Sequence, residues 1–287
     1  MATLVSMNQG WCILSPVYND WDCAERLVSD IELNFQGKGF QKVFFVDDSS
    51  NTVIPDRLKE MDTVEIIALT RNLGHQRAIA IGLSYICDRY DFSHVVVMDS
   101  DGEDRPEDIT HLLENHVEDP ENEVIFAHRK RRHEGVVFKT LYYTYRVLFQ
   151  MLTGERIAFG NFCLIPRERL KRVVHISEIW NHFSGGIIRS RIPYHTVPVN
   201  RGKRYFGSSK MNFTALIIHG ISSITVHLDV VAVRLLMTFA ILIGLIVVLI
   251  TGSGLIIEPQ SYGLDNFSGT VSLLTVFALL FLLLFAA

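Results

Sequence analysis

The sequence predicts an α/β fold with a mostly parallel sheet, followed at the carboxyl end by membrane-associated helices. Three observations support this prediction. Apolar strand patterns alternate with helical patterns through the first hundred residues, a polar cluster follows each of these strands, and two long apolar runs lie at the end of the chain. A chain of 287 residues has room for about one α/β domain and a small membrane anchor.

The alternation of strands and helices is regular in the amino-terminal part of the chain. Strands are expected at 11–20 with a closing turn, 42–46, 64–69 and 94–98. Helices are expected over about 22–34 and through 78–83. Strands joined by crossover helices lie parallel to one another, so their carboxyl ends share one edge of the sheet.

The fourth strand runs into an acidic turn that contains Asp99, Asp101 and Glu103. Acids at the carboxyl end of such a strand lie where open α/β sheets bind ligands. Because clustered carboxylates repel one another, a divalent cation is a suitable partner, and oxygen ligands favour Mg²⁺ or Mn²⁺. Such a metal would hold a phosphate. The alternative is a solvated turn that leads to a helix capped near Asp104, with Pro106 in its first turn.

The three earlier strands also end in polar segments, at 18–20, 47–50 and 70–75. We expect these segments to meet the acidic turn at the same edge of the sheet. The coincidence predicts a nucleotide site.

Four motifs carry a resemblance to a known family. They are SPVYND at 15–20, VDDSS at 46–50, RNLG at 71–74 and DSDGE at 99–103. In order and spacing they resemble the P-x-Y-N-E, V-D-D-G-S, R-N-x-G and D-x-D-x-Q motifs of family-2 glycosyltransferases. Within that family the likeness is to polyprenyl-phosphate glycosyltransferases, which include dolichyl-phosphate mannose synthase. The resemblance covers roughly residues 10–230 and implies a GT-A nucleotide-sugar-binding domain.

The chain departs from the family pattern at four positions. Asp20 replaces Glu, Ser49 replaces Gly, Glu103 replaces Gln, and His75 stands where many relatives carry Lys. The first three exchanges are chemically mild, whereas the fourth alters contacts to the donor phosphates.

The resemblance also implies roles for individual residues. The donor-binding residues that it implies are Pro16, Tyr18, Asp20, Asp48, Arg71 and Ser100. Pro16, Tyr18 and Asp20 are expected to line the base and ribose pocket, and Asp48 is expected to hold the base edge. The metal ligands and catalytic acids that it implies are Asp99, Asp101 and Glu103, with Arg204 as a further catalytic residue.

The middle of the chain is rich in cations and aromatic residues. Residues 128–133 read HRKRRH, and the probable helix at 138–149 combines Tyr, Phe and Leu with a few cations. This pattern favours a helix on a membrane surface. A nucleic-acid patch is the competing interpretation, but the net charge of −4 and the lack of an RNA-binding aromatic motif disfavour it.

Two later segments extend the resemblance. Residues 159–167 resemble the G-x-F-R-L segment of the same enzymes, with Cys163 in place of the usual polar residue. Residues 201–210 resemble their R-x-x-G-x-S-K motif. The resulting acceptor-phosphate residues are Arg131, Arg204, Ser209 and Lys210. Arginine, lysine and hydroxyl groups on a glycine-containing loop suit an anion, although a simple basic patch beside the membrane is the alternative.

The carboxyl end predicts two membrane spans, at 230–250 and 271–287. The loop between them carries no Lys or Arg, whereas Lys203, Arg204 and Arg234 precede or begin the first span. The positive-inside rule therefore places the catalytic domain in the cytoplasm, with a bacterial inner membrane as the expected location.

The expected domains are a GT-A domain over 1–228 and a transmembrane hairpin over 229–287. Interfacial helices are expected near 138–153 and 212–228. The four cysteines have no disulfide or zinc spacing. Association into a homo-oligomer through the hairpin remains open.

The predicted activity is metal-dependent, inverting transfer of one sugar from a UDP- or GDP-sugar to a polyprenyl phosphate. A lipid phosphate is already anionic and needs no general base, and the E-D pair of many hydroxyl-directed relatives is absent at 177–182. One alternative is a lipid or glycan hydroxyl as acceptor, with Glu178 or His182 as base. The other is a membrane protein that binds a sugar nucleotide without turnover.

Overall fold

The computed structural model describes residues 10–118, 122–129, 136–155, 159–207 and 213–256. The chain divides into two compact units. The first unit comprises residues 1–147 and 155–226, and the second comprises 148–154 and 227–287.

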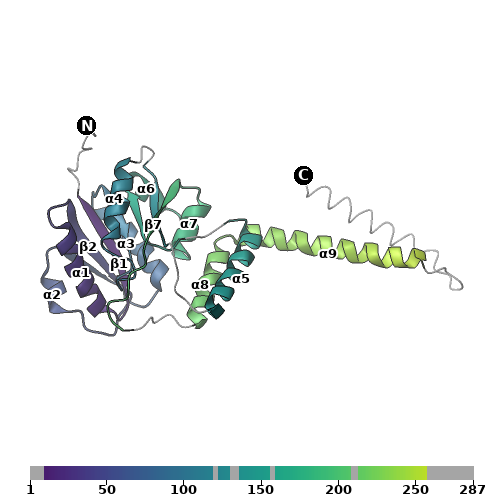
Figure 1. Ribbon diagram of the computed structural model, residues 1–287, viewed down its shortest axis with the longest axis horizontal. Helices are drawn as coiled ribbons and strands as arrows, with labels where there is room; N and C mark the ends of the chain where they lie inside the picture. Colours follow the sequence, from purple (N-terminus) through teal and green to yellow (C-terminus); the bar gives the residue numbers. More distant parts are fainter. Residues whose placement is uncertain (1–9, 119–121, 130–135, 156–158, 208–212, 257–287) are drawn as a thin grey trace. The chain divides into compact units, whose positions relative to one another are not determined.

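The first unit contains a seven-stranded sheet (Figure 1). Its strands are β1 (Trp11–Val17), β2 (Phe40–Asp47), β3 (Val64–Ala68), β4 (His94–Val97), β5 (Val124–Arg129), β6 (Cys163–Pro166) and β7 (Tyr194–Val199). They lie in the order β3-β2-β1-β4-β6-β5-β7. The prediction of an α/β fold with a mostly parallel sheet is confirmed.

Strand β6 runs against its two neighbours, β4 and β5, while the other pairs in the sheet are parallel. Val95 faces Ile165 and Val97 faces Cys163 across the β4–β6 pair. Because β6 is reversed, it begins at the edge where β1, β2 and β4 end. The residues just before β6 therefore reach the predicted ligand edge, which the sequence did not predict.

Helices cover both faces of the sheet. The chain forms α1 (Trp21–Phe35), α2 (Asp56–Glu60), α3 (His75–Arg89), α4 (Asp108–Glu118), α6 (Arg167–Val173), the 3₁₀ helix η1 (Ser177–Trp180) and α7 (Phe183–Arg189). One core lies under α1, α2 and α4, and the other lies under α3, α6, η1 and α7. Neighbouring residues such as Ile13 and Leu14 alternate between these cores. Burial on both faces explains why the strands are apolar throughout.

Helices α5 (Val136–Thr153) and α8 (Phe213–Thr225) lie near 138–153 and 212–228, where interfacial helices are predicted, and their place at a membrane interface stays a prediction. Within the first unit the hydroxyls of Tyr145 and Ser223 share a hydrogen bond, so the two helices lie side by side. The described part of this pair within the first unit exposes five large apolar side chains, which are Tyr143, Val147, Ile217, Ile218 and Ile221.

The second unit contains α9 (Leu228–Ile256). Its segment Leu228–Val248 has a mean hydropathy of 2.7 and is long and apolar enough to cross a membrane. Arg234, the cation in this segment, donates a hydrogen bond of 3.0 Å to the carbonyl oxygen of Met151 near the end of α5. This contact satisfies the cation and a helix-terminal carbonyl together. The second predicted span, 271–287, lies outside the described residues, so the hairpin stays a prediction.

Candidate functional site

The loops after β1 and β2 are locked together at the carboxyl edge of the sheet. The amide of Asn19 donates to Ser50 Oγ at 2.8 Å, and the amide of Asn51 donates to Asn19 Oδ1 at 2.6 Å. Asn19 and Ser49 both have left-handed backbones, with φ of 54° and 62°. This conformation favours glycine, which explains why the resembling motif has Gly where this chain has Ser49.

Asp48 connects β2 to the loop before α3. Its side chain is buried, and its two carboxylate oxygens accept hydrogen bonds from the amides of Leu73 at 2.6 Å and Gly74 at 2.9 Å. This contact positions the RNLG loop, in which Arg71 is exposed. The predicted contact of Asp48 with a nucleotide base stays a prediction.

Tyr18 stands at the same edge with 43% of its surface exposed, whereas Pro16 is buried. The buried Ser100 donates its hydroxyl to the carbonyl oxygen of Pro16 at 3.4 Å. The structure therefore leaves the Tyr18 side chain partly open to solvent, two residues after the contact that joins β1 to the turn after β4.

The acidic turn is stabilised by its own side chains. Asp104 accepts a hydrogen bond from the amide of Asp99 at 3.0 Å, and Asp101 accepts one from the amide of Glu103 at 3.0 Å. Helix α4 begins only at Asp108, so the helix cap near Asp104 in the alternative interpretation of this turn is not found. Asp104 is too far upstream to cap that helix, and it braces the turn instead.

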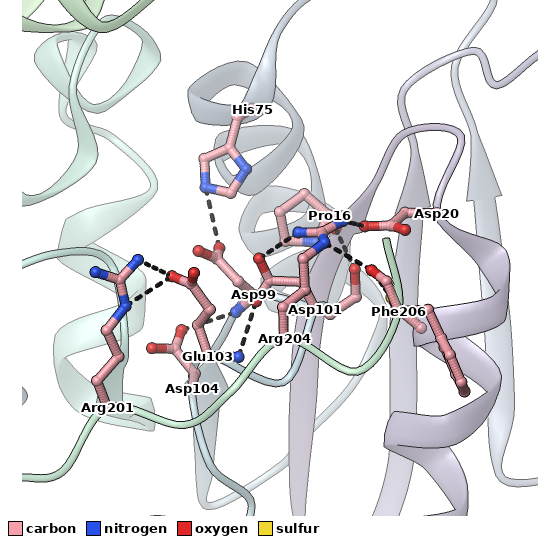
Figure 2. A network of polar contacts seen from close by, with 12 residues as sticks. Pro16, Asp20, His75, Asp99, Asp101, Glu103, Asp104, Arg201, Arg204 and Phe206 are labelled. Carbon is pink, nitrogen blue, oxygen red and sulfur yellow. Dashed lines mark hydrogen bonds and ion pairs between the residues drawn. The ribbon is translucent and has the colours of Figure 1, made fainter. Parts of the chain in front are cut away.

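Two arginines from the segment 201–206 are paired with this turn (Figure 2). Arg204 donates to Asp101 Oδ2 at 2.7 Å and also to the carboxylate of Asp20. Its Nε donates to the carbonyl oxygen of Phe206 at 2.9 Å. Arg201 donates to Glu103 Oε2 through two nitrogens, at 2.6 and 3.1 Å.

The acidic turn places Asp101 in a largely buried, negatively charged environment. Burial and the nearby charge of Asp99 raise the pKa of Asp101 to about 6, even though Arg204 opposes the shift. Within the part of the chain that the structure describes, no three His, Cys, Asp or Glu side chains are grouped to hold a metal ion. The predicted metal ligands are thus neighbours on one turn, and two of them are engaged by guanidinium groups.

His75 joins three segments at this edge. It begins α3, and its Nε2 lies 3.3 Å from Asp99 Oδ1 and 3.0 Å from Asn161 Nδ2 (Figure 2 shows the contact with Asp99). In the sequence, His75 stands out only as a departure from the family pattern, and Asn161 was not predicted as a site residue. The reversal of β6 brings Asn161 here, and no local sequence pattern signals that reversal.

The two candidate bases for a hydroxyl acceptor are engaged elsewhere. The buried His182 precedes α7, and its Nδ1 accepts a hydrogen bond from the amide of Gly185 at 3.1 Å. Glu178 accepts from Ser177 Oγ at 2.8 Å and lies 3.5 Å from Arg189 Nε. The Ser177 hydrogen bond and the Arg189 charge lower the pKa of Glu178, which makes it a weaker base. The predicted acceptor residues Arg131, Ser209 and Lys210 lie outside the described residues.

Comparisons with known proteins identify relatives of this arrangement. Residues 12–178 match the family model described as glycosyl transferase family 2. An uncharacterized glycosyltransferase, YkcC, from Bacillus subtilis is 29% identical over 191 residues, which cover 62% of this chain and 55% of that protein. The chain thus spans about half the length of that relative. An undecaprenyl-phosphate 4-deoxy-4-formamido-L-arabinose transferase from Klebsiella pneumoniae is 25% identical over 251 residues, which cover 82% of this chain and 72% of that protein.

Solved structures share the fold. Glucosyl-3-phosphoglycerate synthase from Mycobacterium tuberculosis, in complex with Mn²⁺, UDP-glucose and phosphoglyceric acid, superposes with a TM-score of 0.57 at 15% identity. The match covers 78% of this chain and 80% of that one. Mannosyl-3-phosphoglycerate synthase from Rubrobacter xylanophilus matches with a TM-score of 0.55 at 14% identity, over 77% of this chain and 73% of that one.

Proposed function

This chain belongs to glycosyl transferase family 2, and from that premise we propose that it moves a single sugar from a UDP- or GDP-sugar to a polyprenyl phosphate. One observation carries the proposal. Arg204, from the predicted acceptor motif, contacts both Asp20 and Asp101 of the predicted donor motifs. The residues proposed for the two substrates therefore share one site. The relative from Klebsiella pneumoniae is named for transfer to undecaprenyl phosphate, in agreement with this acceptor class.

The donor half of the proposed site lies between the β1 loop and the acidic turn. The exposed ring of Tyr18 offers a stacking face for the base. Asp20, Asp48, Arg71 and Ser100 complete the proposed contacts. Hydrogen bonds tie the loops after β1, β2 and β4 to one another, so these residues are held at one edge of the sheet.

We assign Mg²⁺ or Mn²⁺ to the acidic turn, whose three acids are not grouped around one point in the described residues and would have to converge on the ion. Its donors are carboxylate oxygens, which such ions prefer. Burial, and after it the charge of Asp99, raises the pKa of Asp101, and two guanidinium groups neutralise part of the negative charge of the turn. Asp99 and Asp101, with Glu103, are the residues that would hold the ion. When bound, it would supply positive charge that stabilises the leaving nucleoside diphosphate.

The acceptor half of the proposed site comprises Arg131, Arg204, Ser209 and Lys210. These residues bind and orient an anionic phosphate, whose oxygen attacks the anomeric carbon as the bond to the donor diphosphate breaks. The attack inverts that carbon. No general base is needed, in agreement with the structural engagement of Glu178 and His182.

We place the active unit on the cytoplasmic face of a bacterial inner membrane. The apolar segment Leu228–Val248 has the length of a span. Lys203 and Arg204 precede this segment and Arg234 lies in its first turns, so the positive-inside rule favours a cytoplasmic active unit. The exposed apolar residues of α5 and α8 suit contact with the lipid interface.

The test is transfer by the purified full chain in liposomes. A panel of UDP- and GDP-sugars is offered with undecaprenyl or dolichyl phosphate, and the lipid products are identified by mass spectrometry. The matched control is the corresponding polyprenol, which has a hydroxyl but no phosphate. We expect product only with the phosphate. Product from the polyprenol alone would contradict the proposal and favour the hydroxyl acceptor, and absence of product with every donor would contradict transferase activity.

A further inference from the structure

The segment 201–206 lies directly on the acidic turn, backbone against backbone. The amide of Gly202 donates to the carbonyl oxygen of Glu103 at 2.8 Å, and the amide of Tyr205 donates to that of Asp101 at 2.8 Å. The approach is close, because a Cβ added to Gly202 would lie 2.1 Å from the carbonyl oxygen of Gly102. Two hydrogen bonds thus hold the segment on either side of Gly102.

The ring of Tyr205 fills the space over Gly102. A Cβ added to Gly102 would lie 2.7 Å from two carbons of that ring, and the φ of +87° also favours glycine there. The other side of the ring packs against the core that includes α1. Burial and the nearby Asp30 carboxylate of α1, which pairs with Arg26 at 3.0 Å, raise the pKa of the Tyr205 hydroxyl.

The side chain of Tyr205 is therefore held by contacts that do not involve the carboxylates of the turn. Its neighbour Arg204, by contrast, is held by Asp101 and Asp20, the residues that substrates are expected to engage. When substrates change the partners of Arg204, the ring of Tyr205 and the two backbone hydrogen bonds remain. The anchor and the working arginine are adjacent in the chain but depend on different partners.

We propose that Tyr205 is a positioning residue that fixes the segment 201–206 on the acidic turn and thereby sets where Arg204 meets the acceptor phosphate. This inference rests on the proposed function, because it assigns Arg204 to the lipid phosphate. The inference adds an uncharged residue, Tyr205, to a site whose other members are mostly charged. It also explains why Gly102 and Gly202 stand opposite each other, since side chains at either position would push the segment away.

The experiment compares Tyr205→Ala and Tyr205→Phe in the full chain with Phe40→Leu as a matched control. Phe40 is a half-buried aromatic residue against the same core, but it contacts Trp11 at the amino end of β2, away from the turn. Three quantities are measured: hydrogen exchange of the amides in 201–206, the affinity for the nucleotide, and kcat and KM for undecaprenyl phosphate.

Tyr205→Ala is expected to lose exchange protection at Gly202 and at residue 205, and to raise KM for the lipid phosphate about tenfold. Nucleotide affinity should stay within about twofold. Tyr205→Phe, which keeps the ring, should retain most of the protection and KM. Phe40→Leu should lower thermal stability without changing the exchange protection of residues 201–206 or the KM for the lipid phosphate.

Two outcomes would overturn the proposal. One is retained exchange protection in Tyr205→Ala. The other is a loss of stability and kcat with unchanged KM, as expected of a residue that serves only the core. Hydrogen exchange needs no substrate, so a wild-type protein that uses another acceptor would refute the proposed function while the loss of protection still supported the anchoring role of Tyr205.

Discussion

Arg201 and Arg204 belong to one short segment, yet they differ in depth and in partners. The side chain of Arg204 is 15% exposed and spans two carboxylates from different loops, whereas that of Arg201 is 32% exposed and pairs with Glu103. A guanidinium can bridge two carboxylates in a fixed fork, which a lysine ammonium cannot. Arg204 is thus the residue whose exchange should disturb the site most.

Arg204→Ala should reduce transfer to polyprenyl phosphate about tenfold to a hundredfold, because a charged hydrogen bond contributes about 1.5–3 kcal/mol. Arg204→Lys should recover only part of the loss. Arg201→Ala serves as the control and should cost less than about threefold. Transfer is assayed at varied lipid phosphate, and donor binding is measured by calorimetry. If Arg204→Ala loses donor affinity but keeps its dependence on the acceptor, Arg204 serves the donor diphosphate instead.

Asp101→Asn should abolish divalent-dependent transfer while the protein stays folded, because it removes one anionic ligand from the acidic turn. Transfer is titrated with Mg²⁺ and Mn²⁺, and folding is followed by circular dichroism. Asp56→Asn is the control, since Asp56 is highly exposed on α2, outside the proposed site. Activity that resists chelators, or normal turnover in Asp101→Asn, would refute the metal assignment.

At the scale of elements, strand β3 lies at one edge of the sheet and is fastened by Glu65. This carboxylate accepts hydrogen bonds from Tyr85 and Tyr90 and pairs with Lys42 of β2 at 3.1 Å. Burial alone would raise the pKa of Glu65, but the hydrogen bonds from Tyr90 and Tyr85 and the charge of Lys42 hold it below its ordinary value. A lowered folded-state pKa stabilises the fold above the unfolded value of about 4.3.

Glu65→Gln should therefore lower the free energy of unfolding by about 1 kcal/mol at pH 7. The difference from wild type should shrink as the pH falls through the folded-state pKa of Glu65, because the wild-type carboxyl is then protonated as well. Thermal unfolding in detergent at pH 7 and at acid pH measures both effects. Glu60→Gln, on an exposed position of α2, is the control. An equal difference at both pH values would show that the charge of Glu65 contributes nothing.

The helix pair α5 and α8 gives a prediction about lipid. A chain that ends before Val230 should still float with anionic liposomes, because Tyr143, Ile217, Ile218 and Ile221 remain exposed. The same truncated chain with Ile218→Glu and Ile221→Glu is the matched variant and should float less. Equal flotation of both, or flotation of neither, would show that these side chains do not hold the domain on the membrane.

Local patterns predicted the first four strands and the helices α1 and α3, because apolar runs such as Val95–Val97 and the turns after them depend on neighbouring residues alone, whereas the short helix α2 was not predicted. The direction of β6 could not be predicted in this way. Its residues, Cys163–Pro166, are buried on both faces in either direction, so only the pairing with β4 and β5 decides. Asn161 was missed for that reason.

The site residues were predicted by motif, but their partners were not. The motifs located Asp20, Asp101 and Arg204 on separate segments, and the structure joins them through ion pairs. Ion pairs between residues 103 positions apart depend on tertiary packing, which the sequence pattern does not encode. Asp104 shows the same limit. The alternative interpretation placed it at a helix cap, but its side chain accepts a hydrogen bond from the amide of Asp99 within the turn.

At the scale of the whole molecule, the order of segments along the chain connects chemistry to the membrane. The segment 201–206 is followed by α8, which ends at Thr225. Residues 226 and 227 connect it to α9, which begins at Leu228. The proposed acceptor motif thus immediately precedes the helices proposed to contact lipid. We expect a lipid phosphate to enter the proposed site while its tail stays in the bilayer.

The double engagement of Arg204 has a kinetic consequence. Its N–H groups already serve Asp20, Asp101 and the carbonyl oxygen of Phe206, so a lipid phosphate that arrives first must compete with two carboxylates. A donor that arrives first with a divalent cation would occupy Asp20 through its ribose hydroxyls and Asp101 through the cation, and would thereby release the guanidinium. We therefore expect ordered addition, with the sugar nucleotide before the lipid.

Binding of undecaprenyl phosphate should then be about tenfold tighter in the presence of a non-transferable donor analogue, and Arg204→Ala should lose this dependence. Equilibrium binding with and without the analogue measures it. Equal affinity under both conditions would mean random addition, in which neither substrate affects the binding of the other.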